Sequence, residues 1–557
     1  MNLPASIQPK VGASLITRVT RLYNGTIADC LHELLQNARR AGASAIIMDV
    51  EECDGAQILS IADDGCGIDD PRNLLTLGQS GWEVEIAARE DPAGMGVFSL
   101  AGRHVTVRSW SQSAQAGWQV TIPEHGWEGA VPLAIEPAEM ERGTLFRVTL
   151  PSAWAKGLEA AVRQVASYFP LPVHFCGKEV EREDFLAEAL YIEVWRGLRI
   201  GIFRSSGRQH RDAPRINFHG VTVPCRHDPV EEVDGHAYWN ARVDILDAPA
   251  LQLVLPARKE MVENEALSQL RCEMEAVNYR AIALQPGHRL SFASWQRAAQ
   301  LGITLPEASA WLDSWVPAVA DNTAIPSGGQ VASGEMMIVH RSGADLEQAA
   351  AAVIRNTMLM GLRPVNGEPA FEGYGWYDRL PRITAIDFTF EHEGQSWIYG
   401  DSAKEYLPHT LPSGRVASLL LELTMAGSGQ PDAAVSTRTF EVPMLVANNE
   451  TYCLDEALIL IARDEKIDPG DLATLMEASL FCASEDADSD SWQTQNEYFC
   501  ANARNLANTL LLGEEQALIA RLREAVREHV VWLIPHGREM VVTASPGLMD
   551  LVLSTPE

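Results

Sequence analysis

The first part of the chain carries first a helical and then a strand-like hydrophobic pattern. Apolar residues recur at helical spacing from Leu15 to Ala41, and the repeat stops at Gly42, a residue that favours helix ends. Two β-rich runs follow at Ala45–Val50 and Gln57–Ile61, separated by the turn-forming pair Asp54-Gly55. Further strands are predicted at His104–Trp110, Gly117–Ile122 and Gly143–Leu150. This order predicts an antiparallel sheet with helices on one face, an α+β layer.

A second α+β pattern begins near Pro151. Its helices are predicted near Leu158–Tyr168 and over Asn264–Ile282. Its strands are predicted near Ile192–Ile202, Arg215–Val223 and Leu251–Leu255. We therefore expect a second domain that also mixes helices with a sheet.

Two breaks divide the rest of the chain. Residues 321–334, DNTAIPSGGQVASG, are small and polar with Pro and Gly, which is typical of a linker or loop, and Ala426–Pro431 is a second break. We expect an N-terminal domain over residues 1–152, a second domain over 153–287, an α/β region over 288–425 and a mostly helical region over 426–557.

The last region combines an acidic stretch with an amphipathic helix. No Lys or Arg occurs from Ile467 to Ala503, and SEDADSD in that stretch is interpreted as a solvated acidic loop rather than a metal site. Beyond it, a predicted helix is striped by Leu518, Leu522, Val526, Val530 and Leu533. We interpret the region as one that binds a protein partner.

Size and charge restrict the possible functions. At 557 residues the chain is too long for one hydrophobic core, and 46% hydrophobic with 21% charged residues excludes wholesale disorder. Lys and Arg number 44 against 75 Asp and Glu, a formal charge of -31. Such a charge repels a phosphate backbone unless basic residues gather locally. Nucleic acid is therefore a possible but disfavoured partner.

Cysteine usage and the apolar runs predict a cytoplasmic protein. The nine cysteines are scattered without Cys-x-x-Cys or finger-like spacing, which favours reduced thiols. The start, MNLPASIQPK, has no apolar signal segment, and no window approaches 18 uncharged apolar residues. We expect neither secretion nor a membrane span.

Glu33 and Asn37 are the first candidate functional pair. They lie four residues apart in HELLQNARRAG, so their side chains share one face of the predicted helix. A carboxylate can serve as a general base, and a carboxamide oxygen suits Mg²⁺. A solvated polar face explains the same pair, because Glu-x-x-x-Asn occurs by chance about once in a chain of this length.

A strand-end motif follows in IADDGCGIDD. Asp63 ends a β-run, and Gly65, Gly67 and Ile68 come directly after it. The carboxylate can accept a hydrogen bond from a flat ligand, and the glycines let that ligand approach the backbone closely. The alternative is a plain turn, since Asp-Gly pairs form turns readily.

A glycine-rich segment, DPAGMGVFSLAGR, is the third motif. Gly94 and Gly96 lead into apolar helical residues, and such a start presents unpaired N–H groups to an anion. An ordinary helix start fits these residues equally well. No Lys occurs between Lys10 and Lys156, so there is no P-loop in this part of the chain. A triphosphate would be held by backbone amides and Mg²⁺ instead.

In combination these motifs resemble a known superfamily. Glu33/Asn37, Asp63-x-Gly65-x-Gly67, Gly94-x-Gly96 and Gly143-Thr144 follow the order and spacing of the GHKL (Bergerat-fold) ATPases, namely gyrase-type topoisomerases, heat-shock-90-type chaperones, MutL-type repair proteins and histidine kinases. The resemblance covers residues 1–150 and is specific in combination, because independent chance matches multiply. It implies a Bergerat-type α/β sandwich with ATP and Mg²⁺ as ligands.

The resemblance also implies roles for individual residues. Glu33 looks like the general base, Asn37 like the Mg²⁺ ligand and Asp63 like the carboxylate that reads adenine. Further nucleotide contacts are implied for Gly65, Gly67, Ile68, Ser80 at the start of the lid, Gly94, Met95, Gly96, Val97 and Phe98 of the phosphate loop, and Thr144. Two departures from the pattern are Arg40, where many relatives carry Asp, and Gln79 in the lid, where some carry Lys.

The second domain is similar to the transducer domain that follows the ATPase in several of these relatives. In VLPARKEMVENEALSQL a strand end is followed by Arg258 and Lys259, and the resemblance implies that one of them reaches the γ-phosphate. A cation there would stabilise charge during phosphoryl transfer. An exposed ion-pairing surface is the alternative for these two residues.

Two other clusters are interpreted structurally. Glu391-His392-Glu393 alternates across a predicted strand, which separates the His from the two acids and disfavours a metal site. Core or interface packing is favoured for Tyr374, Trp376 and Tyr377.

The expected function is a Mg²⁺-dependent ATP hydrolase that acts slowly as a nucleotide-driven clamp. The resemblance implies a homodimer through ATP-dependent contacts of the N-terminal domains. We expect a chaperone-like action on a protein client bound through the C-terminal region. A nucleic-acid clamp subunit and a nucleotide sensor with negligible turnover stay open as alternatives.

Overall fold

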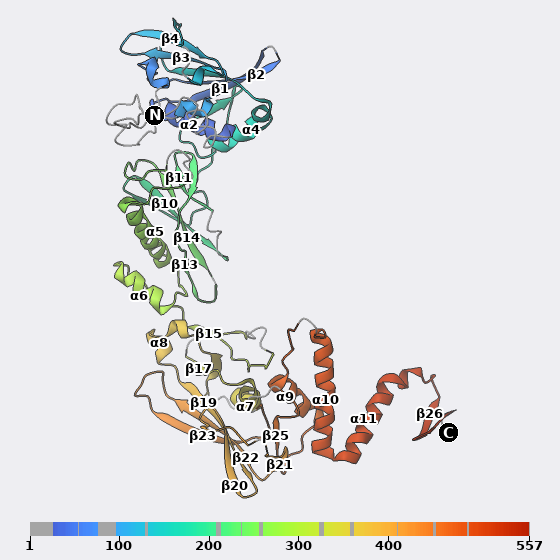
Figure 1. The fold of residues 1–557 in the computed structure, drawn as a ribbon. Helices are drawn as coiled ribbons and strands as arrows, with labels where there is room; N and C mark the ends of the chain where they lie inside the picture. The colour runs from blue at the N-terminus through green and yellow to red at the C-terminus, as the bar shows by residue number, and fades with distance from the viewer. Residues whose placement is uncertain are drawn as a thin grey trace, which may run out of the picture. The chain divides into compact units, whose positions relative to one another are not determined.

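The fold consists of two compact units, residues 1–306 and residues 307–557 (Figure 1). The structure, a computed structural model, describes residues 26–53, 55–75, 96–128, 132–207, 213–235, 237–254, 260–321, 328–332, 334–356, 361–408, 410–448, 453–486 and 489–555. Helices and strands are interleaved through both units, so the expected α+β class is confirmed.

The first layer of unit 1 is a sheet with helices on one face. Its described strands follow the order β5-β4-β3-β6-β2-β1-β7-β8 and are antiparallel except where β1 pairs with β7. They are β1 Ile46–Cys53, β2 Ala56–Asp63, β3 Val105–Ser111, β4 Ala116–Ile122, β5 Ile135–Pro137, β6 Thr144–Thr149, β7 Val173–Phe175 and β8 Lys178–Glu179. In β1, Ile46 and Met48 are buried while Ile47 between them is exposed, so one face of the sheet is solvated.

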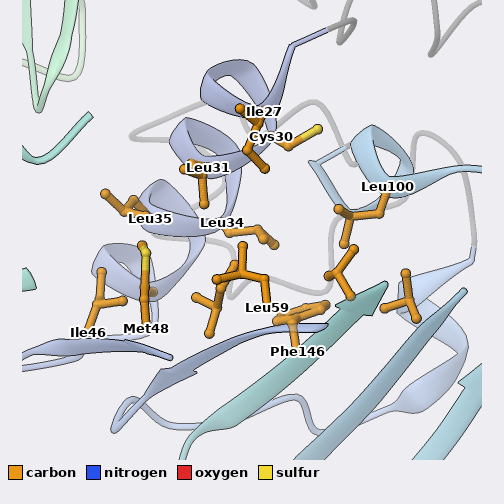
Figure 2. Close-up of a cluster of buried hydrophobic side chains, with 14 of the residues drawn as sticks. Ile27, Cys30, Leu31, Leu34, Leu35, Ile46, Met48, Leu59, Leu100 and Phe146 are labelled. Carbon is orange, nitrogen blue, oxygen red and sulfur yellow. The ribbon is translucent and has the colours of Figure 1, made fainter. Parts of the chain in front are cut away.

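Helix α2 (Ile27–Arg40) covers the buried face of this sheet. Thr26 and Asp29 form a reciprocal capping box, in which Asp29 N donates to Thr26 Oγ1 at 3.1 Å. Figure 2 shows the apolar face of α2 against the sheet, with Leu31, Leu34 and Leu35 beside Ile46, Met48 and Leu59. The helix ends where the Gly42 signal predicted, because Gly42 takes φ +70°. The expected start at Leu15 lies outside the described residues.

The first layer extends past the expected boundary at residue 152. Helix α4 (Ser152–Ala166) packs on α2, and its buried residues Leu158 and Val162 belong to the same core. Strands β7 and β8 then continue the sheet. The 152/153 boundary is therefore misplaced, because α4 needs the sheet's core to bury its apolar face. Three short 3-10 helices complete the layer, η1 Pro71–Leu74, η2 Gly96–Leu100 and η3 Gly126–Glu128.

The second layer of unit 1 has its own sheet and core. Its described strands follow the order β12-β11-β14-β10-β9, with β13 paired to β14. They are β9 Tyr191–Trp195, β10 Leu198–Ser205, β11 Pro214–Phe218, β12 Val221–Pro224, β13 Val230–Glu231 and β14 Tyr238–Ile245, with η4 Val233–Gly235 before β14. Helices α5 (Glu265–Ala283) and α6 (Phe292–Gln300) pack on it, and the core reaches Leu305. The expected helix over 264–282 is confirmed, whereas the expected boundary at 287/288 falls inside this core.

Two segments of this layer, each expected to form a single strand, are hairpins of two strands. Arg196 and Gly197 both take positive φ and turn β9 into β10, and His219 and Gly220 do the same between β11 and β12. Paired positive φ values suit two-residue hairpin turns, and the sequence contains no Asn-Gly or Asp-Gly signal at either place. The expected strand at 251–255 is reduced to an isolated bridge between Leu253 and Met261, and residue 255 lies outside the described part.

Unit 2 contains a mixed sheet, smaller sheets and a series of helices. Its described strands are β15 Trp311–Asp313, β16 Gln330–Ala332, β17 Met336–Val339, β18 Arg363–Asn366, β19 Arg382–His392, β20 Gln395–Gly400, β21 Gly414–Val416, β22 Leu419–Ala426, β23 Val435–Glu441, β24 Met444–Ala447, β25 Leu458–Ala462, β26 Glu539–Ser545 and β27 Leu548–Ser554. Its helices are α7 Ala344–Asn356, η6 Pro369–Phe371, α8 Gly375–Asp378, α9 Pro469–Leu480, α10 Trp492–Leu512, α11 Glu514–His529 and η7 Val531–Leu533.

The sheet pairing in unit 2 revises one expectation. Strands β22 and β23 are hydrogen-bonded neighbours, so the expected boundary at 425/426 falls within one sheet, inside the last residues of β22. The segment 467–503 is mostly α9 and α10, and the described residues of the acidic SEDADSD run lie in the connection between them. Tyr374 and Tyr377 are buried against Phe371, as the packing interpretation predicts. None of the helices in the described ranges is long and apolar enough to cross a bilayer.

Candidate functional site

Glu33 and Asn37 lie on α2, with Glu33 buried at 7% exposure and Asn37 partly exposed. Their neighbours Leu34, Leu35 and Ala38 face the core, which fixes the rotation of the helix about its axis. The last turn of the helix leads to Ala41, whose main-chain N donates to Asn37 O at 2.9 Å. Glu33 and Asn37 therefore lie in the middle and in the last turn of α2, before the chain continues to β1.

Among the described residues, Arg40 contacts the side-chain oxygen of Asn37. Arg40 Nη1 donates to Asn37 Oδ1 at 3.3 Å. A carboxamide oxygen can accept a second contact, yet a guanidinium opposes a cation that approaches the same atom. The departure at Arg40 noted in the sequence thus falls directly on the expected metal ligand.

Asp63 is the last residue of β2, and the loop that follows it contacts the C-terminal end of α2. Gly65 N donates to Asp63 Oδ1 at 2.9 Å. Burial raises the pKa of Asp63 from its usual 3.8 to about 6, the neighbouring Asp64 adds to the rise, and main-chain donors at Gly65 and Thr144 oppose it. A carboxylate with a raised pKa at a strand end is typical of a functional group.

The two glycines of the motif are required by close packing. A Cβ on Gly65 would lie 2.6 Å from Ala41 Cβ, and Cys66 N donates to Ala41 O at 2.9 Å. Gly67 takes φ +80°, and a Cβ there would lie 2.3 Å from Trp110 O. The motif therefore docks on the end of α2, which brings Asp63 and the Asn37 turn to the same corner of the sheet.

Asp64 has a structural role beside Asp63. It accepts from Ser44 N at 2.6 Å and from Ala45 N at 3.4 Å, and these hydrogen bonds, with that of the Ser44 hydroxyl foremost, lower the pKa of Asp64. Its charge also faces Arg142. The two adjacent carboxyl groups therefore differ. Asp64 has a lowered pKa and fixes the loop through its hydrogen bonds, whereas Asp63 has a raised pKa.

Thr144 joins the site through a residue that the sequence analysis did not single out. Asp63 and Thr144 are register partners across β2 and β6. Ser109 Oγ lies 2.9 Å from Thr144 Oγ1 and accepts from Ile68 N at 2.8 Å. Ser109 is fully buried. The alternation of the strand could have indicated Ser109, because it follows Val105 and Val107 at alternate positions and so shares their buried face.

Gly96, Val97 and Phe98 lie in η2 beside α2. Cys30 Sγ donates to Ser99 O at 3.1 Å, and burial raises the pKa of the Cys30 thiol to about 12, so the thiol stays neutral. The Phe98 ring is 2% exposed and meets Trp127 edge-on at 6.2 Å. The expected α-helix after Gly96 is a five-residue 3-10 helix, and its apolar side chains belong to the core.

Several expected site residues lie outside the described residues. They are Ser80, Gly94, Met95, Arg258 and Lys259. Of the expected set, Glu33, Asn37, Asp63, Gly65, Gly67, Ile68, Gly96, Val97, Phe98 and Thr144 are described, and contacts link the Asp63, Ile68 and Thr144 group to the end of α2. In the described ranges, no three His, Cys, Asp or Glu side chains gather as a metal cluster.

The second layer contacts α2 between Glu33, the expected general base, and Asn37, the expected Mg²⁺ ligand. Gln36, 1% exposed, donates through Nε2 to the main-chain oxygen of His219 at 2.6 Å. Its Oε1 accepts from Arg39 Nε at 3.2 Å, which fixes the orientation of the amide. The tip of the β11–β12 hairpin therefore contacts the helix that carries Glu33 and Asn37.

The chain matches no protein-family model, and no curated protein matches it.

Proposed function

We propose that the first layer binds Mg²⁺-ATP at the Asp63 corner and hydrolyses the nucleotide slowly, as an ATPase of the GHKL type with a Bergerat-type fold. The observation that carries the proposal is the convergence at one end of the sheet of a carboxyl group with a raised pKa, two close-packed glycines and a buried hydroxyl pair. These groups belong to Asp63, Gly65, Gly67, Thr144 and Ser109. Flat, hydrogen-bonding ligands such as adenine suit this chemistry.

Each residue has a proposed task. Asp63 accepts a hydrogen bond from the adenine amine, and Gly67 lets the loop after Asp63 pack against Trp110. Asn37 would hold Mg²⁺, which would supply neutralisation of charge on the phosphates. Glu33, one turn before Asn37 on the same helix face, orients the attacking water and takes its proton. The backbone that opens at Gly96, beside α2, faces the phosphates.

The second layer transmits the nucleotide state in this proposal. Its hairpin already touches α2 at Gln36. Arg258 or Lys259 reaches the γ-phosphate when the triphosphate is intact and loses that contact after hydrolysis. The resulting movement resets a clamp on a protein client, and the charge of -31 favours a protein over nucleic acid as that client.

Hydrolysis by the parent and by Glu33→Ala tests the assignment. We expect ATP binding, measured by calorimetry, to persist while turnover falls by roughly 10²–10⁴-fold, the usual contribution of a general base. Glu159→Ala on α4, whose side chain is 76% exposed, is the matched control and keeps parental turnover. Equal turnover in the parent and Glu33→Ala would reject Glu33 as the base, and absence of ATP binding by the parent would reject the nucleotide site.

The client class is tested with the same variant. Glu33→Ala with ATP should hold the closed state and retain a protein partner in a pulldown. Retention of DNA at low salt, lost steeply as salt rises, would instead favour the nucleic-acid clamp.

A further inference from the structure

Strand β9 forms one edge of the second sheet in unit 1. It ends the strand order β12-β11-β14-β10-β9, so within the ranges that the structure describes no strand pairs with its outer side. The opposite edge, β12, has no exposed side chain and ends at Pro224. Proline cannot donate to a further strand and is one of the residues that protect natural sheet edges, as lysine is. β9 contains neither residue.

The turn between β9 and β10 determines which backbone groups of β9 face outward. Residues 196–197 both take positive φ, which makes a two-residue turn closed by the pair Trp195 and Leu198. The closing pair of such a turn is hydrogen-bonded, and bonded and non-bonded pairs alternate along an antiparallel ladder. Ile192 and Val194 therefore occupy non-bonded positions, where their N–H and C=O groups point away from β10.

The same two residues carry exposed apolar side chains. Ile192 is 41% and Val194 71% exposed, and Leu190, at the alternating position before the strand, is 60% exposed. Over the neighbouring strand β10 this face is covered, because a Cβ on Gly201 would lie 2.9 Å from Leu186 Cδ2. β9 is therefore the open margin of a covered face, and it offers both outward-facing backbone groups and apolar side chains to a further strand.

The other face of β9 carries an excess of negative charge. Glu193 Oε2 accepts from Arg280 Nε at 2.8 Å and from the Tyr191 hydroxyl at 3.1 Å. Arg280 also forms an ion pair with Glu273, so two carboxylates share one guanidinium. The Glu193 side chain is 26% exposed and can be reached by a cation from outside. The surrounding segment 179–193 is acidic as well, with six Asp and Glu against one Arg.

Charge disfavours a second copy of this chain as the partner of β9. Two copies that join their outward-facing groups in antiparallel order pair Ile192 of one with Val194 of the other, which places Glu193 directly opposite Glu193. Like charges directly opposite each other in a sheet are destabilising, and the formal charge of -31 adds repulsion between copies. A Lys or Arg opposite Glu193 makes a favourable pair instead. The edge therefore fits a basic segment of a different protein.

We propose that β9 binds an extended segment of another protein as an additional antiparallel strand. Apolar residues of that segment lie beside Ile192 and Val194, and a Lys or Arg between them lies opposite Glu193. Main-chain hydrogen bonds supply the affinity, and the alternation of apolar and basic side chains supplies the specificity. The edge shares no residue with the Asp63 corner, so the proposal does not rest on the proposed ATPase activity.

Calorimetry of the full chain with designed peptides tests the strand addition. The probe is a short blocked peptide of alternating valine and lysine, and we expect one peptide to bind per chain. The same peptide N-methylated at its valines lacks the amide donors that face β9 and should bind at least 10-fold more weakly, on the order of one lost hydrogen bond or more. An alternating valine and glutamate peptide should bind more weakly by roughly 10-fold, because it sets a carboxylate opposite Glu193.

Three results with the peptides would contradict the proposal. Absence of binding by the valine and lysine peptide would reject the site. Equal binding of the N-methylated peptide would reject strand addition and indicate adsorption to apolar side chains alone. Equal binding of the glutamate peptide would reject the basic partner.

Val194→Pro tests the same contact from the protein's side. The Val194 N–H faces away from β10, so proline removes an outward donor and leaves the β9–β10 ladder in place. We expect the affinity for the valine and lysine peptide to fall roughly 10-fold, with an unchanged circular dichroism spectrum. Parental affinity in Val194→Pro would overturn the role of the β9 edge.

Val194→Lys is a second variant that keeps the backbone donor and replaces the apolar contact with a charge. It should weaken peptide binding by several-fold. The matched control is Val435→Lys, because Val435 is 67% exposed on β23, an edge strand of unit 2, and it should keep parental affinity. A lower molecular mass of Val194→Lys than of the parent in light scattering would show that β9 joins two copies and would overturn the choice of a different protein.

Discussion

Gln36 and His219 connect the two layers of unit 1, because the Gln36 amide donates a 2.6 Å hydrogen bond to the His219 main-chain oxygen. The two residues are 183 positions apart in the sequence. The tip is set by positive φ at His219 and Gly220, and Gly220 N donates to Asn217 Oδ1 at 2.8 Å. Asn217 Nδ2 in turn donates to Tyr168 O at 3.2 Å. The hairpin therefore contacts both α2 and the residues after α4, and it is a rigid link rather than a loose loop.

Gln36→Glu should uncouple this link with little change in shape. The carboxylate still accepts from Arg39 but cannot donate to the His219 oxygen, and the buried charge lacks a donor there. We expect loss of hydrogen-exchange protection around residues 217–220 and a several-fold fall in ATP turnover with little change in KM. Gln296→Glu, the same change at an exposed position of α6, is the control. Unchanged protection would show that the amide does not hold the hairpin.

Nucleotide affinity should depend on the ionisation of Asp63. Its pKa of about 6 in the ligand-free protein means that the accepting carboxylate is present above that pH and protonated below it. Because binding favours the ionised form, affinity for ADP should fall by about tenfold for each unit of pH below 6. Calorimetry between pH 5 and pH 8 measures this, and a flat profile would contradict the assignment of Asp63 as the adenine acceptor.

Asp63 should also lower stability at neutral pH. Its folded pKa lies above the usual 3.8, so the folded state holds the proton more tightly and loses stability as pH rises from about 4 to about 6. Asp63→Asn should therefore raise the free energy of unfolding at pH 7 by on the order of 2 kcal/mol and change little at pH 4. Asp64→Asn should act in the opposite direction at pH 7, because hydrogen bonds lower the pKa of Asp64. Thermal unfolding of both variants decides the signs.

Removing Arg40 should strengthen Mg²⁺ binding in the proposed site. Its guanidinium donates to Asn37 Oδ1 at 3.3 Å, so a cation at that oxygen meets a like charge. Arg40→Ala should lower the Mg²⁺ concentration for half-maximal nucleotide binding by several-fold. Arg163→Ala on α4, 72% exposed, serves as the control for loss of a surface charge. A higher Mg²⁺ requirement in Arg40→Ala would mean that Arg40 orients Asn37 for the metal.

Gly143 should tolerate no side chain. It takes φ +73°, and a Cβ would lie 1.9 Å from Asp63 O, so Gly143→Ala must displace the strand end that carries Asp63. We expect a loss of roughly 2–4 kcal/mol in the free energy of unfolding and weaker nucleotide binding. Gly157→Ala is the contrast, because nothing lies within 4 Å of its Cβ and it sits within helix α4. It should stabilise the protein by roughly 0.5–1 kcal/mol.

Local signals along the chain predicted much of the fold and part of the site. The strands β1, β2, β3, β4 and β6 agree with the expected runs to within a few residues, and α5 agrees with its expected helix. The gathering of Asp63 with Thr144 is likewise consistent with the motif order, since they are register partners. Ser109 was not found, because its role depends on which strand lies beside β6 and not on its neighbours in the sequence.

Local sequence patterns are enough to predict the helix of Glu33 and Asn37, the strands around Asp63 and the apolar stripe of α11. Tertiary structure alone decided that the stripe is exposed, that His219 turns a hairpin onto Gln36, and that α4 belongs to the first core. Periodicity records which face of an element is apolar, whereas burial, turn φ values and pKa shifts arise from contacts between residues far apart in the chain.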